Sequence, residues 1–163
     1  MKDLLPLGEK IGALLKARKQ TIVVAESSTG GLISAALLAV PGASAYFMGG
    51  GVLYTRKSIA ALKGMSEDMF AGKNGCTEEW AKMIAGAMKE QCGTTWGLGE
   101  SGATGPTGNR YGDPAGTSSI VVIGPVERAI RLQTGSADRV ANMRAFSAAA
   151  LELFLDVLGK QKG

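Results

Sequence analysis

The sequence contains no histidine among its 163 residues. This absence excludes, within the chain, every Ser-His or Cys-His catalytic pair and every histidine-ligated metal. The only two cysteines, Cys76 and Cys92, form no Cys-x-x-Cys pair and are typical of a reducing compartment. The residues therefore predict no metal site, and any hydrolytic chemistry must take its base from lysine, tyrosine, a carboxylate or an activated water.

Long apolar runs and clusters of basic residues are missing as well. The net charge is +4, and no run of five or more Lys and Arg residues occurs, so nucleic acid is not the expected partner. A small anionic ligand such as a nucleotide phosphate remains compatible with this charge. No 18-residue apolar run suggests a membrane span, and the first ten residues lack a signal-peptide core. We therefore expect a cytoplasmic protein without membrane association.

What is present indicates a single α/β domain over residues 1–163. Buried-type strand runs alternate with amphipathic helical patterns in the first part of the chain, and two strands then follow one another directly. This order predicts a mixed central sheet with helices on both faces. The expected strands are 21–26, 45–54, 94–101, 117–124 and 128–134. The expected helices are 2–19, 32–40, 56–63, one starting at Thr77, and about 137–158, the last with Val140, Met143, Phe146, Leu151 and Phe154 facing the core.

Three polar, glycine-rich segments follow predicted strands, at 26–31, from Tyr54 onward, and at 101–116. Ligands of open α/β sheets bind at the carboxyl ends of strands, so we expect these segments to converge there. The first segment also opens a helix, whose N–H groups would favour an anion. The alternative is that Ser28 or Thr29 merely caps this helix. The glycines at 49–51 indicate that a partner or another part of the backbone approaches the second strand closely.

The ordered segments ESSTGG, PGASAYFMGGGVLYT, SGATGPTG and DPAG resemble the motif series of the CinA C-terminal family, from about Ile11 to Leu155. This resemblance implies a three-layer α/β/α sandwich that is often dimeric, without the amino-terminal molybdopterin-binding-like domain of longer members. It also implies the hydrolysis of nicotinamide mononucleotide, a small-molecule nucleotide, to nicotinic acid mononucleotide and ammonia, with no metal or organic cofactor.

The same resemblance assigns roles to particular positions. It places the catalytic serine at Ser44 and the motif tyrosine at Tyr54. It also implies that the phosphate is bound by Arg139, with Arg144 as the alternative, together with the helix start at Ser27. The positions implied to bind substrate are Ser27, Thr29, Gly30, Gly31, Ser101, Gly102 and Arg139.

The chain departs from the family pattern where the catalytic base is expected. The family lysine position holds Ile59 and the family asparagine position holds Arg56. Lys63, one helical turn beyond Ile59, and Lys57 are the candidates to replace the base, because a lysine with a lowered pKa can accept a serine proton. The alternatives are a catalytically silent nucleotide-binding or regulatory protein and a hydrolase acting on a different amide.

Other departures fall on polar residues. Glu100 occupies a strand position that is usually apolar in the family, where it is solvated, paired with a cation such as Arg56, or itself a displaced base. Arg110 and Tyr111 are additions within the long loop; they either line a pocket or lie in water at the loop tip, and we expect water.

Overall fold

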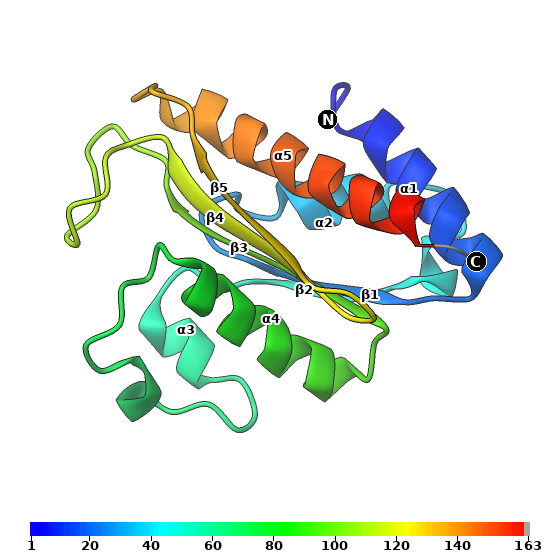
Figure 1. Cartoon of the computed structure of the whole chain (residues 1–163), viewed down its shortest axis with the longest axis horizontal. Helices are drawn as coiled ribbons and strands as arrows, with labels where there is room; N and C mark the ends of the chain where they lie inside the picture. Colours follow the sequence, from blue (N-terminus) through cyan, green and yellow to red (C-terminus); the bar gives the residue numbers. More distant parts are fainter. Residues whose placement is uncertain (162–163) are drawn as a thin grey trace.

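A five-stranded mixed sheet lies between two layers of helices in the computed structural model, which describes residues 1–161 (Figure 1). The strand order is β2-β1-β3-β4-β5, with β1 parallel to β2 and β3, and with β3, β4 and β5 antiparallel. The strands are β1 (Ile22–Glu26), β2 (Phe47–Val52), β3 (Trp96–Ala103), β4 (Thr117–Ile123) and β5 (Arg128–Gln133). The helices are α1 (Leu5–Arg18), α2 (Leu32–Leu38), α3 (Arg56–Ala60), α4 (Glu78–Cys92) and α5 (Arg139–Lys160), with short 3₁₀ helices η1 (Ala43–Ala45) and η2 (Glu67–Phe70).

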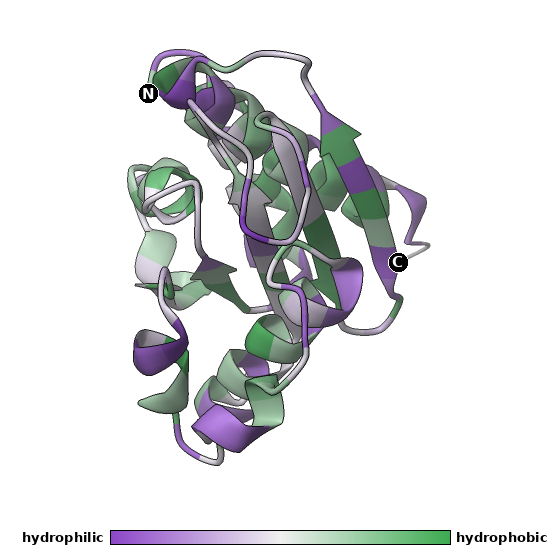
Figure 2. Cartoon of the chain, turned by 90° about the vertical axis from the view of Figure 1, so that its left-hand side faces the viewer, coloured by the Kyte–Doolittle hydropathy of each residue, from purple (hydrophilic) through white to green (hydrophobic). Residues whose placement is uncertain are grey.

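The two faces of the sheet carry separate apolar cores. One core joins the sheet to α1, α2 and α5, with Trp96 and Phe154 in an edge-on contact at 5.5 Å between ring centres. The other joins it to α3 and α4 and contains Ile59, Phe70 and Trp80. Figure 2 shows green apolar segments both in the strands of the sheet and in the helices of the two layers. This arrangement confirms the predicted three-layer α/β/α sandwich with a mixed sheet.

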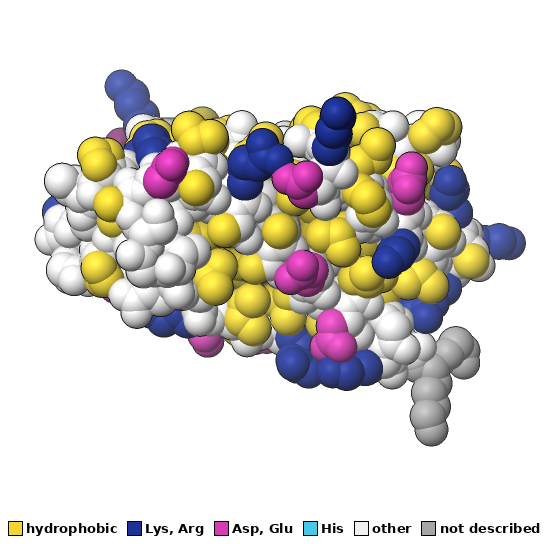
Figure 3. All heavy atoms as spheres, turned by 90° about the horizontal axis from the view of Figure 1, so that it is seen from above, with side chains coloured by type: hydrophobic (Ala, Val, Ile, Leu, Met, Phe, Trp, Pro, Cys, Tyr) yellow, Lys and Arg dark blue, Asp and Glu magenta, His cyan; other side chains and the backbone are white. Residues whose placement is uncertain are grey.

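The outer face of the layer formed by α1 and α5 shows no comparable segregation of apolar and charged side chains. On the face formed by α1 and α5, side chains of both charge signs are interspersed with apolar ones (Figure 3). Among the described residues, no helix combines the length and the apolar character that a membrane crossing requires.

Two details differ from the sequence prediction. Val140 is 66% exposed rather than in the core, because Asn142 takes the inward position in the first turn of α5 and a residue two places away points to the opposite side. The helix predicted at 56–63 ends at Ala60. Gly64 adopts φ 80°, a left-handed conformation that breaks the helical path, so Lys63 lies beyond the helix.

Close contacts between backbones explain why two positions are occupied by glycine. A Cβ atom at Gly99 would lie 2.2 Å from the Ala81 carbonyl oxygen, so α4 packs directly on β3. A Cβ atom at Gly8 would lie 2.4 Å from the Ala36 carbonyl oxygen, which allows α1 to approach α2. Neither carbonyl can move without displacing its helix.

The same substitution should therefore have opposite effects at two helical glycines. We expect Gly8→Ala to lower the free energy of unfolding by about 1–3 kcal/mol, because the added methyl group overpacks the α1–α2 contact. Gly159→Ala meets open space within α5 and should raise it by roughly 0.5–1 kcal/mol, because alanine is the better helix former. Urea unfolding of both variants measures these changes, and an equal effect of the two would contradict the packing explanation.

Candidate functional site

A cleft of about 720 Å³ opens at the carboxyl ends of β1, β2 and β3, where the sequence predicted a ligand crevice. Ser27 follows β1, Tyr54 follows β2, and Ser101 and Gly102 lie near the end of β3; all four line the cleft. The long loop after β3 closes one side through Tyr111. The structure thus brings together residues that are distant in the chain and that the sequence had assigned to one site.

Arg139 joins this group through Tyr54. Its Nη2 atom donates to the Tyr54 hydroxyl at 3.1 Å, and its Nη1 atom donates to the Gly105 carbonyl at 2.7 Å. The alternative arginine, Arg144, instead forms an ion pair with Asp3. Of the two candidates, only Arg139 contacts a residue of the cleft.

Cationic and aromatic side chains form a second wall of the cleft. Arg56 donates to the Tyr111 hydroxyl at 2.8 Å, and its guanidinium lies 5.6 Å from the centre of the Trp80 ring. Arg110 donates to the same hydroxyl at 2.8 Å. Partial burial opposes ionisation of Tyr111, but these hydrogen bonds and charges outweigh it and lower the pKa of the phenol below its usual value. Arg110 and Tyr111 are both exposed, as expected, and both also line the cleft, which was the alternative.

The long loop holds Tyr111 in place through Asp113. This carboxylate accepts hydrogen bonds from Asn109 at 2.8 Å and Asn74 at 3.1 Å and pairs with Arg131. Desolvation opposes its ionisation, but these contacts prevail and lower the pKa of Asp113. Sequence reasoning missed this support. The only available signal was the asparagine four residues before the aspartate, a spacing that allows a local side-chain turn.

Glu100 lies beneath the cleft and is fully buried. It accepts hydrogen bonds from the Ser27 and Thr29 N–H groups at 3.2 and 3.0 Å, and from the hydroxyls of Ser28 and Ser118. Neither solvation nor the expected pairing with Arg56 occurs; neutral donors surround this carboxylate instead. Without access to the cleft, Glu100 is a structural anchor rather than a displaced base.

Glu26 occupies the start of α2 in the same manner. Its carboxylate is fully buried and accepts from the N–H groups of Gly31 and Ile33, each at 3.0 Å, and of Ser34 at 2.8 Å. The predicted capture of a phosphate by this helix start is therefore wrong, because the N–H groups already bind a carboxylate. Gly30 and Gly31 serve the turn, with φ of 65° and 98°.

Thr29 connects the two carboxylates. Its hydroxyl lies 2.8 Å from Glu26 Oε2 and 2.9 Å from Glu100 Oε2, and the side chain is completely buried. Thr29, predicted to bind substrate or alternatively to cap α2, instead links β1 to β3 through these two contacts.

Gly102 has a packing role as well as a place in the cleft wall, because a Cβ atom there would lie 2.7 Å from the Thr117 carbonyl oxygen.

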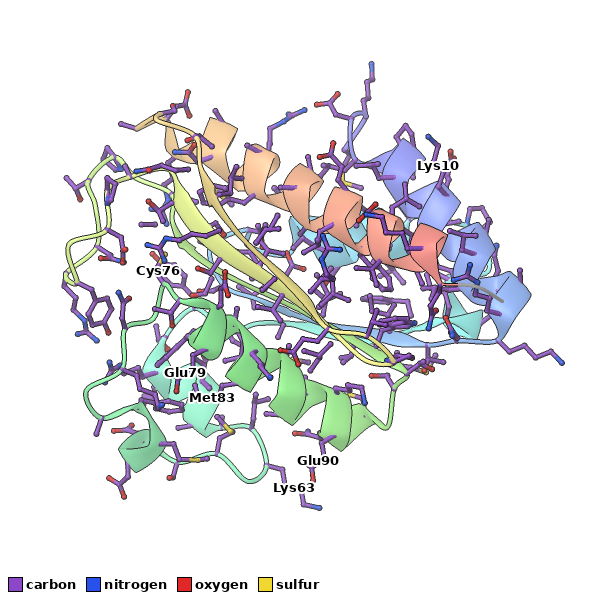
Figure 4. All side chains as sticks on the ribbon, in the orientation of Figure 1. Lys10, Lys63, Cys76, Glu79, Met83 and Glu90 are labelled. Carbon is purple, nitrogen blue, oxygen red and sulfur yellow. The ribbon has the colours of Figure 1, made fainter. Side chains whose placement is uncertain are left out.

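The lysines predicted to replace the catalytic base separate in space. Ile59 is 1% exposed within the core, and Lys57 lines the cleft. The Lys63 N–H group donates to Gln91, and Figure 4 shows Lys63 beside Glu90, at the opposite end of α4 from Cys76 and the cleft. Because α4 has 15 residues, this separation is roughly 20 Å. Lys63 does not belong to this cleft.

Ser44, the predicted nucleophile, also lies away from the cleft within one chain. It is exposed in η1, just before β2 begins, and Phe47 pairs with Ile22 at the amino ends of the strands. Tyr54 follows the other end of β2, which spans roughly 20 Å at about 3.3 Å per residue. The chain therefore holds Ser44 and Tyr54 at opposite ends of the same strand.

Cys76 is a buried thiol beside the cleft. Burial first, and the Asp113 carboxylate second, raise the pKa of Cys76 from 9.0 to about 11. Within residues 1–161, no group of three His, Cys, Asp or Glu side chains is arranged to hold a metal ion.

Thr29→Val tests the link between the carboxylates. Valine has nearly the same shape but no hydroxyl, so Glu26 and Glu100 each lose a contact, and the free energy of unfolding should fall by about 1–3 kcal/mol. Thr107→Val, at an exposed position of the long loop, is the matched control and should change it by less than about 0.5 kcal/mol. Equal values in urea unfolding would show that the hydroxyl contributes nothing.

Cys76 should resist alkylation in the folded protein. At pH 8 its thiolate population is about a hundredfold below that of a thiol with pKa 9.0. The raised pKa also means that burying the protonated Cys76 thiol contributes to the free energy of unfolding. This contribution is complete below pH 9 and is lost as the pH rises towards 11. Iodoacetamide labelling at pH 8, read by mass spectrometry, should modify the exposed Cys92 and leave Cys76 intact; rapid labelling of Cys76 in a Cys92→Ser variant would contradict this.

Comparison with known proteins identifies relatives of the whole fold. The sequence matches the CinA C-terminal domain over residues 5–158. A CinA-like protein of Myxococcus xanthus is 40% identical over 129 residues, which are 77% of this chain and 31% of that protein. Another from Chloroherpeton thalassium is 36% identical over 158 residues, 94% of this chain and 38% of that protein. The chain thus spans about a third of the length of these curated relatives.

Solved structures agree on the fold. A competence-damaged protein (CinA) superfamily protein from Klebsiella pneumoniae superposes with a TM-score of 0.89 at 22% identity, covering 97% of this chain and 99% of its own. A competence damage-inducible protein A from the same species gives a TM-score of 0.90 at 22% identity, covering 98% and 99%. With the sequence match along nearly its entire length, the chain belongs to the CinA C-terminal domain family.

Proposed function

We propose that this chain hydrolyses the carboxamide of a nicotinamide nucleotide, converting nicotinamide mononucleotide to nicotinic acid mononucleotide and ammonia. The observation that carries the proposal is the convergence of Ser27, Tyr54 and Ser101 in one cleft, with Arg139 bonded to Tyr54. These are positions at which the chain retains the family motifs. The reaction itself is what family resemblance implies, and it needs no metal or organic cofactor.

The charge of the cleft supports an anionic ligand. Arg56, Lys57 and Arg110 line it, Arg139 lies at its edge, and Glu67 is the one carboxylate among its described lining residues. Because the α2 start is occupied by Glu26, these side chains must neutralise the nucleotide phosphate. A guanidinium can donate two parallel hydrogen bonds to a phosphate, which lysine cannot.

The proposed chemistry uses a serine ester. Because Ser44 lies at the other end of β2 from the cleft of its own chain, the serine that reaches the cleft comes from the second copy of the dimer that the family resemblance implies. The Ser44 oxygen attacks the carboxamide carbon while its proton passes to a base, and ammonia leaves with that proton. Water then cleaves the ester, which releases the carboxylate and restores the serine. The cleft offers two groups as the base: the Lys57 amine at its rim, and the Tyr111 phenol, whose pKa is lowered by Arg110 and Arg56.

A second function, binding of the nucleotide without turnover, is favoured by one observation. The position of the family lysine is Ile59, an apolar side chain that borders the cleft and is 1% exposed, and Lys63 lies at the far end of α4. A chain with this cleft and no base would retain its ligand but lose the reaction, since a well-placed base contributes about 10²–10⁴ in rate.

Ammonia release from nicotinamide mononucleotide separates these functions. We expect slow turnover that Ser44→Ala reduces to the buffer rate, because the nucleophile is lost. Arg139→Ala should lower kcat/KM by roughly tenfold to a hundredfold, because a charge-assisted phosphate contact disappears. Lys57→Ala and Tyr111→Phe identify the base. Only the variant that removes the true base should abolish the plateau that kcat reaches at high pH.

Thermal unfolding with the same nucleotide provides the control. Stabilisation of the folded protein without turnover, abolished by Arg139→Ala, would establish the binding function in place of the enzyme. An absence of both turnover and stabilisation would exclude this ligand for the cleft, and undiminished turnover by Ser44→Ala would exclude Ser44 as nucleophile.

A further inference from the structure

Two arginine side chains of the cleft converge on one oxygen atom. Arg56 and Arg110 each donate through Nη2 to the Tyr111 hydroxyl at 2.8 Å, so the two Nη2 atoms lie no more than twice that distance apart. One such donor is sufficient to hold the hydroxyl, and the second guanidinium adds a like charge that repels the first. Holding Tyr111 in place therefore does not explain why two arginines meet at this point.

No carboxylate of the described chain neutralises this pair. Each of the five ion pairs within residues 1–161 involves other side chains, and Asp113, three residues after Arg110, is bound to Arg131. Glu67, the one carboxylate among the described lining residues of the cleft, forms no ion pair with them either. Two guanidinium charges in an open cleft without a counter-ion favour the binding of an anion.

Unused hydrogen-bond donors are available for such an anion. The Tyr111 oxygen accepts from both arginines, which occupies its two lone pairs, and its own proton has no acceptor among the described residues. The Arg110 side chain uses one of its five N–H groups in hydrogen bonds with the part of the chain that is described. The buried Nε atom of Arg56 has no partner there. Guanidinium N–H groups of this kind bind phosphoryl oxygens strongly.

These donors are held in place before any ligand binds. Arg56 donates to the Lys73 carbonyl at 3.0 Å, and its guanidinium lies 5.6 Å from the centre of the Trp80 ring. The Tyr111 N–H group donates to the Asn109 side chain at 2.9 Å, which fixes the turn of the long loop. An anion that binds here thus meets oriented donors, and the entropic cost of ordering them is reduced.

Arg139 belongs to a separate set of contacts. It comes from α5, on one face of the sheet, whereas Arg56 packs on Trp80 of α4, on the other face (Figure 1). Tyr54 and Arg56 follow β2 two residues apart. The first contacts Arg139 and the second contacts Tyr111, and no hydrogen bond of the described residues joins the two sets. A single phosphoryl group bound by Arg139 therefore leaves the other two arginines without an anion.

We propose that Arg56, Arg110 and the Tyr111 hydroxyl form a second phosphoryl subsite, and that the ligand of the cleft is a nicotinamide nucleotide with two phosphoryl groups. The reaction and the role of Arg139 rest on the proposed function, whereas the subsite rests on the side-chain arrangement alone. Arg139 binds the phosphoryl group next to the nicotinamide ribose, and the second subsite binds the phosphoryl group beyond it. A dinucleotide, in which a diphosphate joins two nucleosides, has this chemistry. In this role Tyr111 donates its proton, so Lys57 remains as the base.

Calorimetric titration tests the subsite without turnover. In the Ser44→Ala chain, which does not consume the ligand, nicotinamide adenine dinucleotide should bind roughly tenfold to a hundredfold more tightly than nicotinamide mononucleotide, because it adds charge-assisted hydrogen bonds. Adding Arg110→Ala or, independently, Arg56→Gln should remove most of this preference. Arg139→Ala should weaken the binding of both nucleotides by a similar factor. Arg128→Ala removes an exposed arginine of β5 outside the cleft and, as the matched control, should change neither affinity.

Ammonia release by the chain with Ser44 intact tests the reaction on the same ligand. The dinucleotide and water should give the corresponding nicotinic acid dinucleotide and ammonia, with a higher kcat/KM than the mononucleotide. Arg110→Ala should reduce this ratio of kcat/KM values by roughly tenfold or more. Circular dichroism establishes that each variant is folded. Arg110 is exposed in the long loop, so its variant remains informative if Arg56→Gln unfolds.

The outcomes separate the subsite from the reaction. Equal affinity for the two nucleotides, or a preference that both Arg56→Gln and Arg110→Ala retain, would overturn the two-phosphoryl ligand. Tighter binding of the mononucleotide on addition of inorganic phosphate, without a preference for the dinucleotide, would place a free phosphate at these arginines and overturn it as well. A dinucleotide that binds as expected but releases no ammonia would contradict the proposed function and leave the subsite established.

Discussion

Two carboxylates buried among neutral donors determine the architecture of this site. Glu26 holds the first turn of α2 and Glu100 holds the preceding loop, while Thr29 bridges them. A buried charge is tolerated only where hydrogen bonds replace its hydration, so the loop has little freedom to rearrange. The cleft above is consequently formed by side chains at strand ends rather than by the N–H groups of a helix, and cationic side chains remain as the groups that can neutralise an anion.

The departures from the family pattern are connected in space. Glu100 replaces a residue that is usually apolar in the family and accepts a hydrogen bond from Ser28, at the position where the family motif E-S-C-T-G-G has its cysteine. Arg56, at the asparagine position, contacts Tyr111, an addition in the long loop. In each case one change supplies the hydrogen-bonding partner of the other. Such paired changes indicate that the cleft retains a defined polar structure although the lysine has given way to Ile59.

Much of the fold was predictable from local pattern, because strand and helix periodicity and the Thr77 helix start are properties of neighbouring residues. Residues such as Ser27, Tyr54 and Ser101 were predictable as one group because strand ends converge. Tertiary contacts were not: nothing local indicates that Glu26 consumes the α2 N–H groups, or that Asp113 and Asn109 hold Tyr111 over the cleft. The face of Lys63 was mispredicted because a helix assumed to continue ends at Ala60.

The arginines of β5 also limit how large an assembly can become. A sheet with two receptive edges can add strands without end, and the product is a fibre. Here Arg128 and Arg131 close one edge, so strand addition is available on a single side of the molecule. Growth by this route would stop after one step, because the second edge of each molecule bears these arginines. The chain can thus carry a bare, glycine-rich strand without the risk of unlimited polymerisation.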